Sequence, residues 1–272
     1  MKIFCQLVNE AASVLDEMTV LIVTYNEAPN IGRTLDKLRW AQRVVVVDSF
    51  SLDETCEVIR EYKNVKVLQR CFDTHADQWN YGLDQLDSEW VLSLDADYQV
   101  ADSLVDELRV LTPPKTVDAY FAHFKYCING HPLRATLYPP RAVLFRRSRC
   151  RYEQKGHTQI LQIHGVYGWL QSPIYHDDRK PLRHWLESQD RYALLEARYL
   201  LIGSSVELDL ADRLRRWIVP APLLVFFYTL LLKGLIFDGW SGWYYVFQRT
   251  LAELLLSLRI TETKLDARKY RG

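Results

Sequence analysis

Short apolar segments alternate with amphipathic segments over the first hundred residues, and this alternation constrains the fold more than any other feature of the chain. Four segments have the composition of buried strands: 19–24, 43–48, 65–69 and 90–94. Three segments with helical spacing separate them: 28–40, 51–62 and 77–86. Strands that are apolar throughout and are connected by helices form parallel sheets covered on both faces. We therefore expect an α/β fold around such a sheet.

The pattern changes after Pro113-Pro114, where β-like segments replace the alternation. These segments are 119–128, 142–146, 158–163 and 168–170. A helix is expected at about 181–202, and a hydrophobic tail follows it. We therefore predict an N-terminal extension at 1–17, an α/β domain at 18–205 and a helical tail at 206–272. The expected helix at 51–62 begins with a capping box formed by Ser51 and Glu54.

Polar side chains gather where three of the expected strands end. Thr24-Tyr25-Asn26-Glu27 ends the first strand, Asp48 closes the second, and Asp95-Ala96-Asp97 follows the fourth. Ligands of parallel sheets bind at the carboxyl ends of strands. Two carboxylates around one small residue supply oxygen ligands for a hard divalent cation, which can stabilise a departing diphosphate. The alternative for Asp95 and Asp97 is a solvated acidic turn, but the three strand ends together favour a ligand site.

Charge is distributed unevenly along a chain whose net charge is zero. Residues 1–100 carry 17 acidic and 9 basic side chains, which leaves 17 acidic and 25 basic ones for the rest. The acidic half suits a metal site, and the basic half suits a phosphorylated substrate or an anionic membrane surface. We see no arm typical of nucleic-acid binding. The six arginines between residues 134 and 152 either bind a diphosphate or an anionic acceptor, or form a solvated face.

The five cysteines are scattered and lack C-x-x-C spacing, which is typical of reduced thiols in a cytosolic compartment. The first 17 residues lack the pattern of a signal peptide. We interpret them as an extension or as a consequence of the choice of start site.

Three motifs occur in an order that a known enzyme family shares. They are Val23-Thr24-Tyr25-Asn26-Glu27, the sequence VDSFSLDET at 47–55, and Leu94-Asp95-Ala96-Asp97. In these motifs the chain resembles family 2 glycosyltransferases, and most closely their bacterial branch of lipopolysaccharide-core β-glycosyltransferases. The resemblance is strong over 18–110 and looser as far as 192. It implies a GT-A fold with a Rossmann-like half and a mixed sheet, a nucleotide-sugar donor, a divalent metal (Mg²⁺ or Mn²⁺) and inversion at the anomeric carbon.

The resemblance also implies roles for the residues at the strand ends. Asp48 contacts the base or ribose of the donor, although capping of the next helix is an alternative. Asp97 ligates the metal directly, while Asp95 contacts ribose or ligates through water. Asp77 and Asn80 contact the sugar or belong to an exposed helix face. The complete expected donor site is Thr24, Tyr25, Asn26, Glu27, Asp48, Asp77, Asn80, Asp95 and Ala96.

An inverting transferase needs a general base for the acceptor hydroxyl. Many relatives supply an aspartate, often as Glu-Asp, but the comparable stretch 152–157 contains none. Glu153 lies 36 residues before Gln189, a spacing similar to that in the family, and is our first candidate. Asp178 and Asp177 are the next candidates, and a surface role is the alternative for Glu153.

Two later segments complete the expected site. His176 is a candidate third metal ligand beside Asp95 and Asp97, with a structural histidine as the alternative. Gln189 and Arg191, in the sequence QDRY, are similar to the family's Gln/Arg-Trp element, which contacts the acceptor or the diphosphate. Ordinary helix surface is the alternative for these two residues.

The tail combines apolar and aromatic segments with arginines. Residues 218–237 contain Lys233 as their only charge, and Pro220 and Pro222 interrupt their start. Residues 239–260 have an amphipathic pattern with several aromatic side chains. This pattern favours monotopic or peripheral attachment to the cytoplasmic face of the inner membrane over a clean span. The alternative is a helical cap on the domain or a homodimer contact.

These observations predict a metal-dependent inverting glycosyltransferase that uses a nucleotide-sugar, most simply a UDP-sugar. Its acceptor is expected to be a lipid-linked or lipopolysaccharide-type glycan, which explains the membrane attachment. A nucleotidyltransferase is one rival, but it needs a Gly-rich, lysine-containing loop after the first strand, and residues 24–31 have neither feature. A non-catalytic membrane scaffold of the same fold is the other rival.

Overall fold

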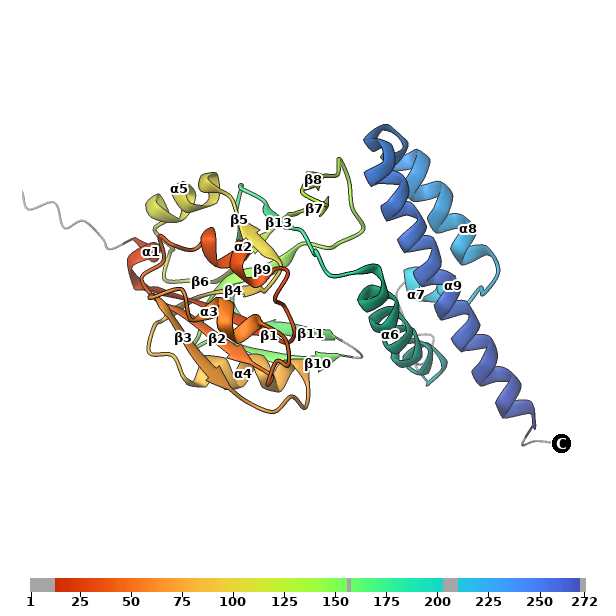
Figure 1. Ribbon diagram of the computed structural model, residues 1–272, viewed down its shortest axis with the longest axis horizontal. Coiled ribbons are helices and arrows are strands. Elements are labelled where there is room, and N and C mark those ends of the chain that lie inside the picture. The colour runs from red at the N-terminus through yellow and green to blue at the C-terminus, as the bar shows by residue number, and fades with distance from the viewer. Residues whose placement is uncertain (1–12, 156–157, 203–209, 270–272) are drawn as a thin grey trace, which may run out of the picture.

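The computed structural model describes residues 13–155, 158–202 and 210–269, and a seven-stranded mixed sheet forms its centre (Figure 1). The strand order is β12-β6-β9-β4-β1-β2-β3. The four strands predicted from the first hundred residues are β1 (Met18–Thr24), β2 (Val44–Asp48), β3 (Val65–Gln69) and β4 (Trp90–Asp95). They pair in parallel, as predicted. The mixed character comes from β9 (Arg141–Arg146), which is antiparallel to β4 and to β6 (Val117–Ala122), and β12 (Val166–Trp169) extends this edge.

Successive side chains of a strand point to opposite faces of a sheet. In the parallel half each face packs in a core of its own. Val20 and Ile22 of β1 pack in one core with α2 (Ile31–Asp36), α3 (Thr55–Ile59) and α5 (Asp102–Val110). Leu21 packs in a second core with α4 (His75–Asp84). This helix approaches the sheet so closely that a Cβ at Gly82 would lie 2.7 Å from Leu21 Cδ1. A short helix, α1 (Val14–Glu17), precedes β1.

Three predicted elements differ from the observed ones. The helix predicted for 28–40 is limited to α2, and the capping box predicted at Ser51 is wrong. Helix α3 begins at Thr55, and the side chain of its N-cap residue, Glu54, makes no capping hydrogen bond. The hydroxyl of Ser51 instead donates to Asp48, because the carboxylate at the strand end competes for it. The segment 119–128 is two strands, β6 and β7 (Phe124–Ile128).

Two small sheets were not predicted as separate sheets, although two of their strands, β7 and β11, lie in segments predicted as β-like. One has the order β5-β13-β7-β8, with β5 (Tyr98–Val100), β13 (Ile174–His176) and β8 (His131–Pro132). The other is the ribbon of β10 (Cys150–Lys155) and β11 (Thr158–Ile163). In the first sheet His176 is paired with Tyr98. A distant segment is thereby placed beside the Asp95-Ala96-Asp97 turn.

Helices form a separate layer at the C-terminal end of the chain (Figure 1). They are α6 (Leu182–Ile202), α7 (Leu210–Arg215), α8 (Pro220–Phe227), a π-helical turn (Tyr228–Leu232), a 3-10 turn (Leu235–Asp238) and α9 (Gly239–Lys269). Helix α9 packs against α6 through Leu256 and Ile260. It also packs on the loop after β8, where the hydroxyls of Tyr245 and Thr136 form a hydrogen bond. Leu133 of this loop and Tyr245 belong to one hydrophobic cluster.

The predicted apolar segment 218–237 is broken rather than continuous. Gly234, with a φ of +69°, separates the π-helical turn from the 3-10 turn. Among the described helices, no single one is long and apolar enough to cross a membrane. One pair, Pro220–Leu232 with Leu235–Asp266, meets the length and composition criteria together, but it is bent by 69°.

Candidate active site

The polar residues predicted to converge do lie on neighbouring strands. Thr24 is in register with Asp48 of β2, and Val23 is in register with Asp95 of β4. The carboxyl ends of β2, β1 and β4 therefore lie side by side at one edge of the sheet. This edge carries Asp48, the residues after Thr24 and the Asp95-Ala96-Asp97 turn, so one ligand can reach all three segments.

Hydrogen bonds join the loop after β1 to the loop after β2. Asn26, in the left-handed region with a φ of +53°, accepts from the Leu52 amide at 2.8 Å. The backbone amide of Asn26 donates to the Ser51 hydroxyl at 2.9 Å. The Asp48 carboxylate is fully buried and accepts from the amide of Ser51 at 3.0 Å and from Gln69 at 3.3 Å. Asp48 therefore organises this double loop from beneath.

Two aromatic rings stand exposed on the double loop. Tyr25 is 48% exposed and Phe50 is 47% exposed. Phe50 has a φ of +59°, a backbone conformation that bulky side chains rarely adopt and that tends to occur at functional sites. Sequence reasoning missed Phe50, although an aromatic residue between the strand-end acid and a helix could have signalled it.

A buried ionic network connects the β1 loop with the segment after β13. Lys180 forms an ion pair with Glu27. Asn30 donates from one nitrogen to Glu27 Oε2 and to Asp178 Oδ1, both at 2.8 Å. Burial raises the pKa of Glu27 to about 7, although the charge of Lys180 acts in the opposite direction. Glu27, which we expected at the donor site, thus connects the loop after β1 with the segment after β13. Asp178 is joined to Glu27 through Asn30, which donates to both carboxylates.

Asp177, a candidate base, is fully engaged by protein groups. Its buried carboxylate forms ion pairs with Arg33 and with Arg179, the latter at 2.9 Å, and accepts from the Gly130 amide at 3.1 Å. Although burial raises the pKa of Asp177, these donors lower it overall. The contacts favour a structural role for Asp177 over proton transfer.

The second acid of the acidic turn meets the histidine that the sequence singled out. His176 Nε2 lies 3.1 Å from Asp97 Oδ2, with both side chains largely buried. Burial disfavours both charges, but each group favours the charged form of the other. The pKa of His176 is therefore raised, and that of Asp97 is lowered. Asp97 Oδ1 and His176 Nδ1 are buried and have no hydrogen-bond partner among the residues that the structure describes.

This pair fits a divalent cation that also binds substrate. Ligands at about 2.1 Å from an octahedral ion, in adjacent positions, are about 3 Å apart, which agrees with the 3.1 Å separation. The unpartnered Asp97 Oδ1 adds ligand capacity. Within the described residues no group of three or more His, Cys, Asp or Glu side chains is placed to share an ion. Asp97 and His176 thus suit an ion that completes its shell with phosphate oxygens and water, as Mg²⁺ usually does.

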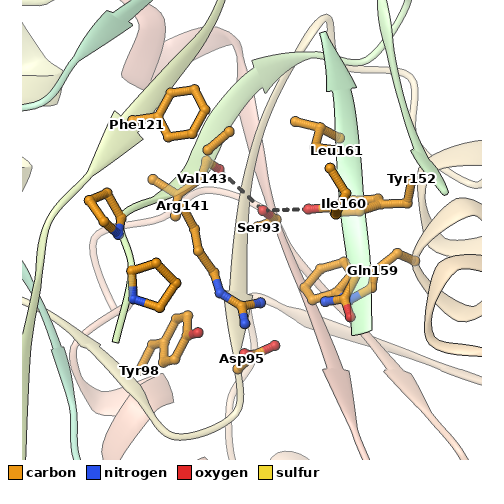
Figure 2. A pocket seen from close by; sticks show the side chains of 14 residues that line it. Ser93, Asp95, Tyr98, Phe121, Arg141, Val143, Tyr152, Gln159, Ile160 and Leu161 are labelled. Carbon is orange, nitrogen blue, oxygen red and sulfur yellow. Dashed lines mark hydrogen bonds between the residues drawn. The ribbon is translucent and has the colours of Figure 1, made fainter. Parts of the chain in front are cut away.

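Asp95 lines a cavity of about 260 Å³ on the β4–β9 side of the site (Figure 2). Its walls are largely apolar and aromatic. Its lining includes Trp79, Asp95, Phe121, Arg141, Tyr152 and Ile160. Trp79 and Tyr152 stack with ring centroids 5.3 Å apart, and the Tyr152 hydroxyl donates to Ser93 at 2.9 Å.

Asp77 and Asn80 have structural partners on and near α4. Thr74 caps the helix by accepting from the Asp77 amide at 3.1 Å, and its hydroxyl donates back to the Asp77 carboxylate at 2.6 Å. Asn80 donates to the carbonyl of Tyr152 at 2.8 Å and accepts from its amide at 3.0 Å. Asn80 thereby fixes β10 against α4, and these contacts support the helix-face alternative for Asp77.

Glu153 lies on β10, on an exposed part of the ribbon. Its carboxylate accepts from Gln162 at 2.8 Å. The residues 156–157 of the same predicted motif lie outside the described residues. Gln189 and Arg191 lie on α6, where Arg191 donates to Ser188 at 3.3 Å. Burial is the main cause that raises the pKa of the adjacent Tyr192.

Sequence comparison finds relatives that are named as glycosyltransferases. An uncharacterized glycosyltransferase of Rickettsia felis is 28% identical over 110 residues, which are 40% of this chain and 38% of the relative. The match thus spans well under half of that relative's length. The lipopolysaccharide core biosynthesis glycosyltransferase LpsC of Rhizobium meliloti is 23% identical over 189 residues, covering 66% of this chain and 70% of LpsC.

The fold is that of GT-A glycosyltransferases. The mannosyltransferase PcManGT of Pyrobaculum calidifontis, solved with GDP-Man and Mn²⁺, superposes with a TM-score of 0.53 at 19% identity and covers 92% of this chain and 87% of PcManGT. Residues 19–167 match the sequence profile of glycosyl transferase family 2, which is more than half of the chain. The chain therefore belongs to glycosyl transferase family 2.

Proposed function

We propose that this protein transfers a sugar from a nucleoside diphosphate donor, with a UDP-sugar as the first candidate, to a lipid-linked or lipopolysaccharide-type glycan. The observation that carries the proposal is the convergence of the ends of β1, β2 and β4 at one edge of the sheet, where Asp95 and Asp97 lie and where His176 is 3.1 Å from Asp97. The similarity to LpsC supports the glycan class, and PcManGT, bound to GDP-Man and Mn²⁺, supports the donor class.

Asp97 and His176 would hold Mg²⁺ or Mn²⁺. Such an ion, when bound, neutralises the charge that develops on a departing diphosphate. The protein contributes the rest of the site. Tyr25 and Phe50 present aromatic rings at the double loop, where a nucleoside would stack on them. Lys180, held by Glu27, adds a positive charge behind the acidic turn.

Inversion requires one carboxylate to accept the proton of the acceptor hydroxyl. Glu153 is our proposed base, because its carboxylate is exposed and, among the described residues, accepts from the side chain of Gln162 alone. Asp178 is less suited to this role. One of its oxygens already accepts from Asn30 and from the Lys180 amide, at 2.8 and 2.9 Å.

We further propose that the C-terminal layer attaches to the cytoplasmic face of the inner membrane, where a lipid-borne acceptor is available. Large apolar side chains of this layer are exposed to a degree unusual for a soluble protein. They are Trp217, Leu223, Leu224, Phe227, Leu231, Leu232, Phe237, Trp240, Phe247, Leu251, Leu254 and Leu258. The bent pair of helices favours attachment at the interface over a straight span.

The test is donor turnover by the purified chain. Incubation with a panel of UDP- and GDP-sugars and Mn²⁺ should release the nucleoside diphosphate from one donor. Chelation of the metal should stop the release, and restored Mn²⁺ should recover it. If the protein binds UDP but hydrolyses and transfers no donor, the scaffold alternative is correct. Formation of a nucleoside diphosphate sugar from a sugar phosphate would instead identify a nucleotidyltransferase.

A further inference from the structure

The structure sorts the six arginines between residues 134 and 152 into two groups. Five of them bind protein groups. Arg134 pairs with Asp238 at 2.8 Å, Arg149 with Asp118 at 2.7 Å and Arg151 with Asp84 at 2.5 Å. Arg146 and Arg147 donate to the carbonyls of Val117 and Ser88 at 3.0 and 3.1 Å. These five arginines have structural partners, so their charges are not held for a ligand.

Arg141 is the exception. It is the first residue of β9, and its side chain lines the cavity beside Asp95. Its guanidinium lies 5.0 Å from the centre of the Tyr138 ring, but within the described part of the chain it makes no hydrogen bond and no ion pair. Figure 2 shows it pointing toward the end of the cavity where Asp95 lies. An arginine is charged at any working pH, and its N–H donors suit a carboxylate or a phosphate.

The rest of the cavity suits a sugar ring. Of the fourteen lining residues, Asp95 and Arg141 are the charged ones, and aromatic rings form much of the wall. Trp79 is 2% exposed, and its indole Nε1 is a buried donor with no partner in the described structure. Buried donors are normally satisfied, so an unpartnered one in a cavity wall indicates a missing acceptor. A sugar offers apolar C–H faces to such rings, oxygens to Trp79, and hydroxyl donors to Asp95.

We propose that this cavity binds a sugar residue that carries a carboxylate or a phosphate, and that Arg141 binds the anionic group. The inference rests on the proposed glycosyl transfer and specifies its substrate. The anionic sugar is either the acceptor residue or the sugar of the donor. Either sugar would place its anionic group against the same guanidinium, because Arg141 and Asp95 line one cavity. This cavity lies on the side of Asp95 away from Asp48.

The test compares methyl β-glucuronide with methyl β-glucoside, a pair that differs in the carboxylate, and adds glucose 6-phosphate as a phosphate probe. Binding to the full chain is measured by calorimetry and by saturation-transfer NMR. We expect at least one anionic probe to bind about 10-fold tighter than the glucoside, as a charge-assisted bidentate contact allows. Arg141→Gln should remove this preference. Arg147→Gln is the matched control and should retain it, since Arg147 bonds to Ser88 outside the cavity.

Equal affinity for all probes, no binding of any probe at tens of millimolar, or a preference that survives in Arg141→Gln would overturn the proposal. Binding of UDP with Mn²⁺ is measured in the same samples. Intact UDP binding without a preference for anionic sugars refutes this inference alone, whereas absent UDP binding refutes the proposed function. If UDP-glucuronate outcompetes UDP-glucose through Arg141, the donor carries the anion. If methyl glucuronide still binds the protein saturated with UDP and Mn²⁺, the acceptor carries it.

Discussion

His176 lies with its Nε2 3.1 Å from Asp97 Oδ2, although 79 positions separate the two residues in the chain. The contact exists because β13 pairs with β5, the short strand that directly follows the acidic turn. A sheet of short strands thus assembles the proposed metal pair at the edge of the large sheet.

Asp97→Ala should abolish metal-dependent donor turnover. Loss of an outer-shell partner alone typically reduces metal affinity or activity 10- to 100-fold, so loss of a direct ligand should reduce turnover by at least about 100-fold. The measurement is nucleoside diphosphate release at saturating Mn²⁺, with circular dichroism to confirm folding. Asp77→Ala is the control, because Asp77 is exposed at the start of α4. Turnover that persists in Asp97→Ala would contradict the metal role.

Phe50→Ala should weaken nucleotide binding. If a nucleobase stacks on this exposed ring, its loss should remove about 1–3 kcal/mol of binding, or roughly 10-fold or more in affinity. Titration of UDP with Mn²⁺ by calorimetry measures the effect. Phe72→Ala is a suitable control, because Phe72 is also exposed, at 50%, but it packs on His75 at the start of α4. Equal losses in the two variants would indicate a general effect on the fold instead of stacking.

Glu153→Gln should leave UDP binding near normal and reduce sugar transfer by at least about 100-fold, because the amide cannot accept a proton. Asp178→Asn is the comparison. It should disturb the Asn30 and Lys180 contacts and thereby lower the thermal midpoint. At a permissive temperature it should reduce the transfer rate less than Glu153→Gln does. The reverse ranking of the two variants in transfer rate would assign the base to Asp178.

The parallel half of the fold was predictable because its strands carry a strong local signal. Val44 to Val47 are apolar on both faces, and the acids that end β2 and β4 mark the ligand edge. The short strands β5 and β13 carry three residues each, too few for periodicity to show. His176 could therefore be proposed as a ligand from its acidic neighbours, whereas its partner strand could not.

Long-range polar contacts were the other limit. Asp177 and Asp178 look equivalent in sequence, yet Arg33 and Arg179 bind the first, and Asn30 binds the second. Arg141 is the first residue of β9 and Arg147 directly follows its last, yet Arg147 donates to the Ser88 carbonyl, whereas Arg141 has no acceptor among the described residues and lines the cavity. Such differences arise from tertiary packing, which no local pattern records.

Thiol reactivity should separate the described cysteines into one fast and three slow groups. Cys71 is exposed, whereas burial is the main cause that raises the pKa of Cys56 and Cys127 to about 11 and that of Cys150 to about 12. A thiol whose pKa is raised by two units holds about 100-fold less of the reactive thiolate. In a Cys5→Ser background at pH 8, Ellman's reagent should therefore label one thiol quickly, and Cys71→Ser should remove that phase. Rapid labelling of the other three in the native protein would show that these sites open to solvent.

The exposed apolar layer should bind membranes through side chains that the fold leaves uncovered. Leu232 is 80% exposed and Trp240 is 88% exposed, on either side of the bend in the helix pair. Burial of one large apolar side chain contributes about 1.5–3 kcal/mol, so the double variant Leu232→Ser/Trp240→Ser should weaken binding to vesicles containing anionic lipid by at least about 100-fold. Co-flotation with vesicles measures this. Val110→Ser is the control, because Val110 is 78% exposed at the end of α5, on the opposite side of the domain (Figure 1). A double variant that floats as well as the wild type, together with a dimer by light scattering that the same substitutions dissociate, would assign the surface to a second copy of the chain instead of to lipid.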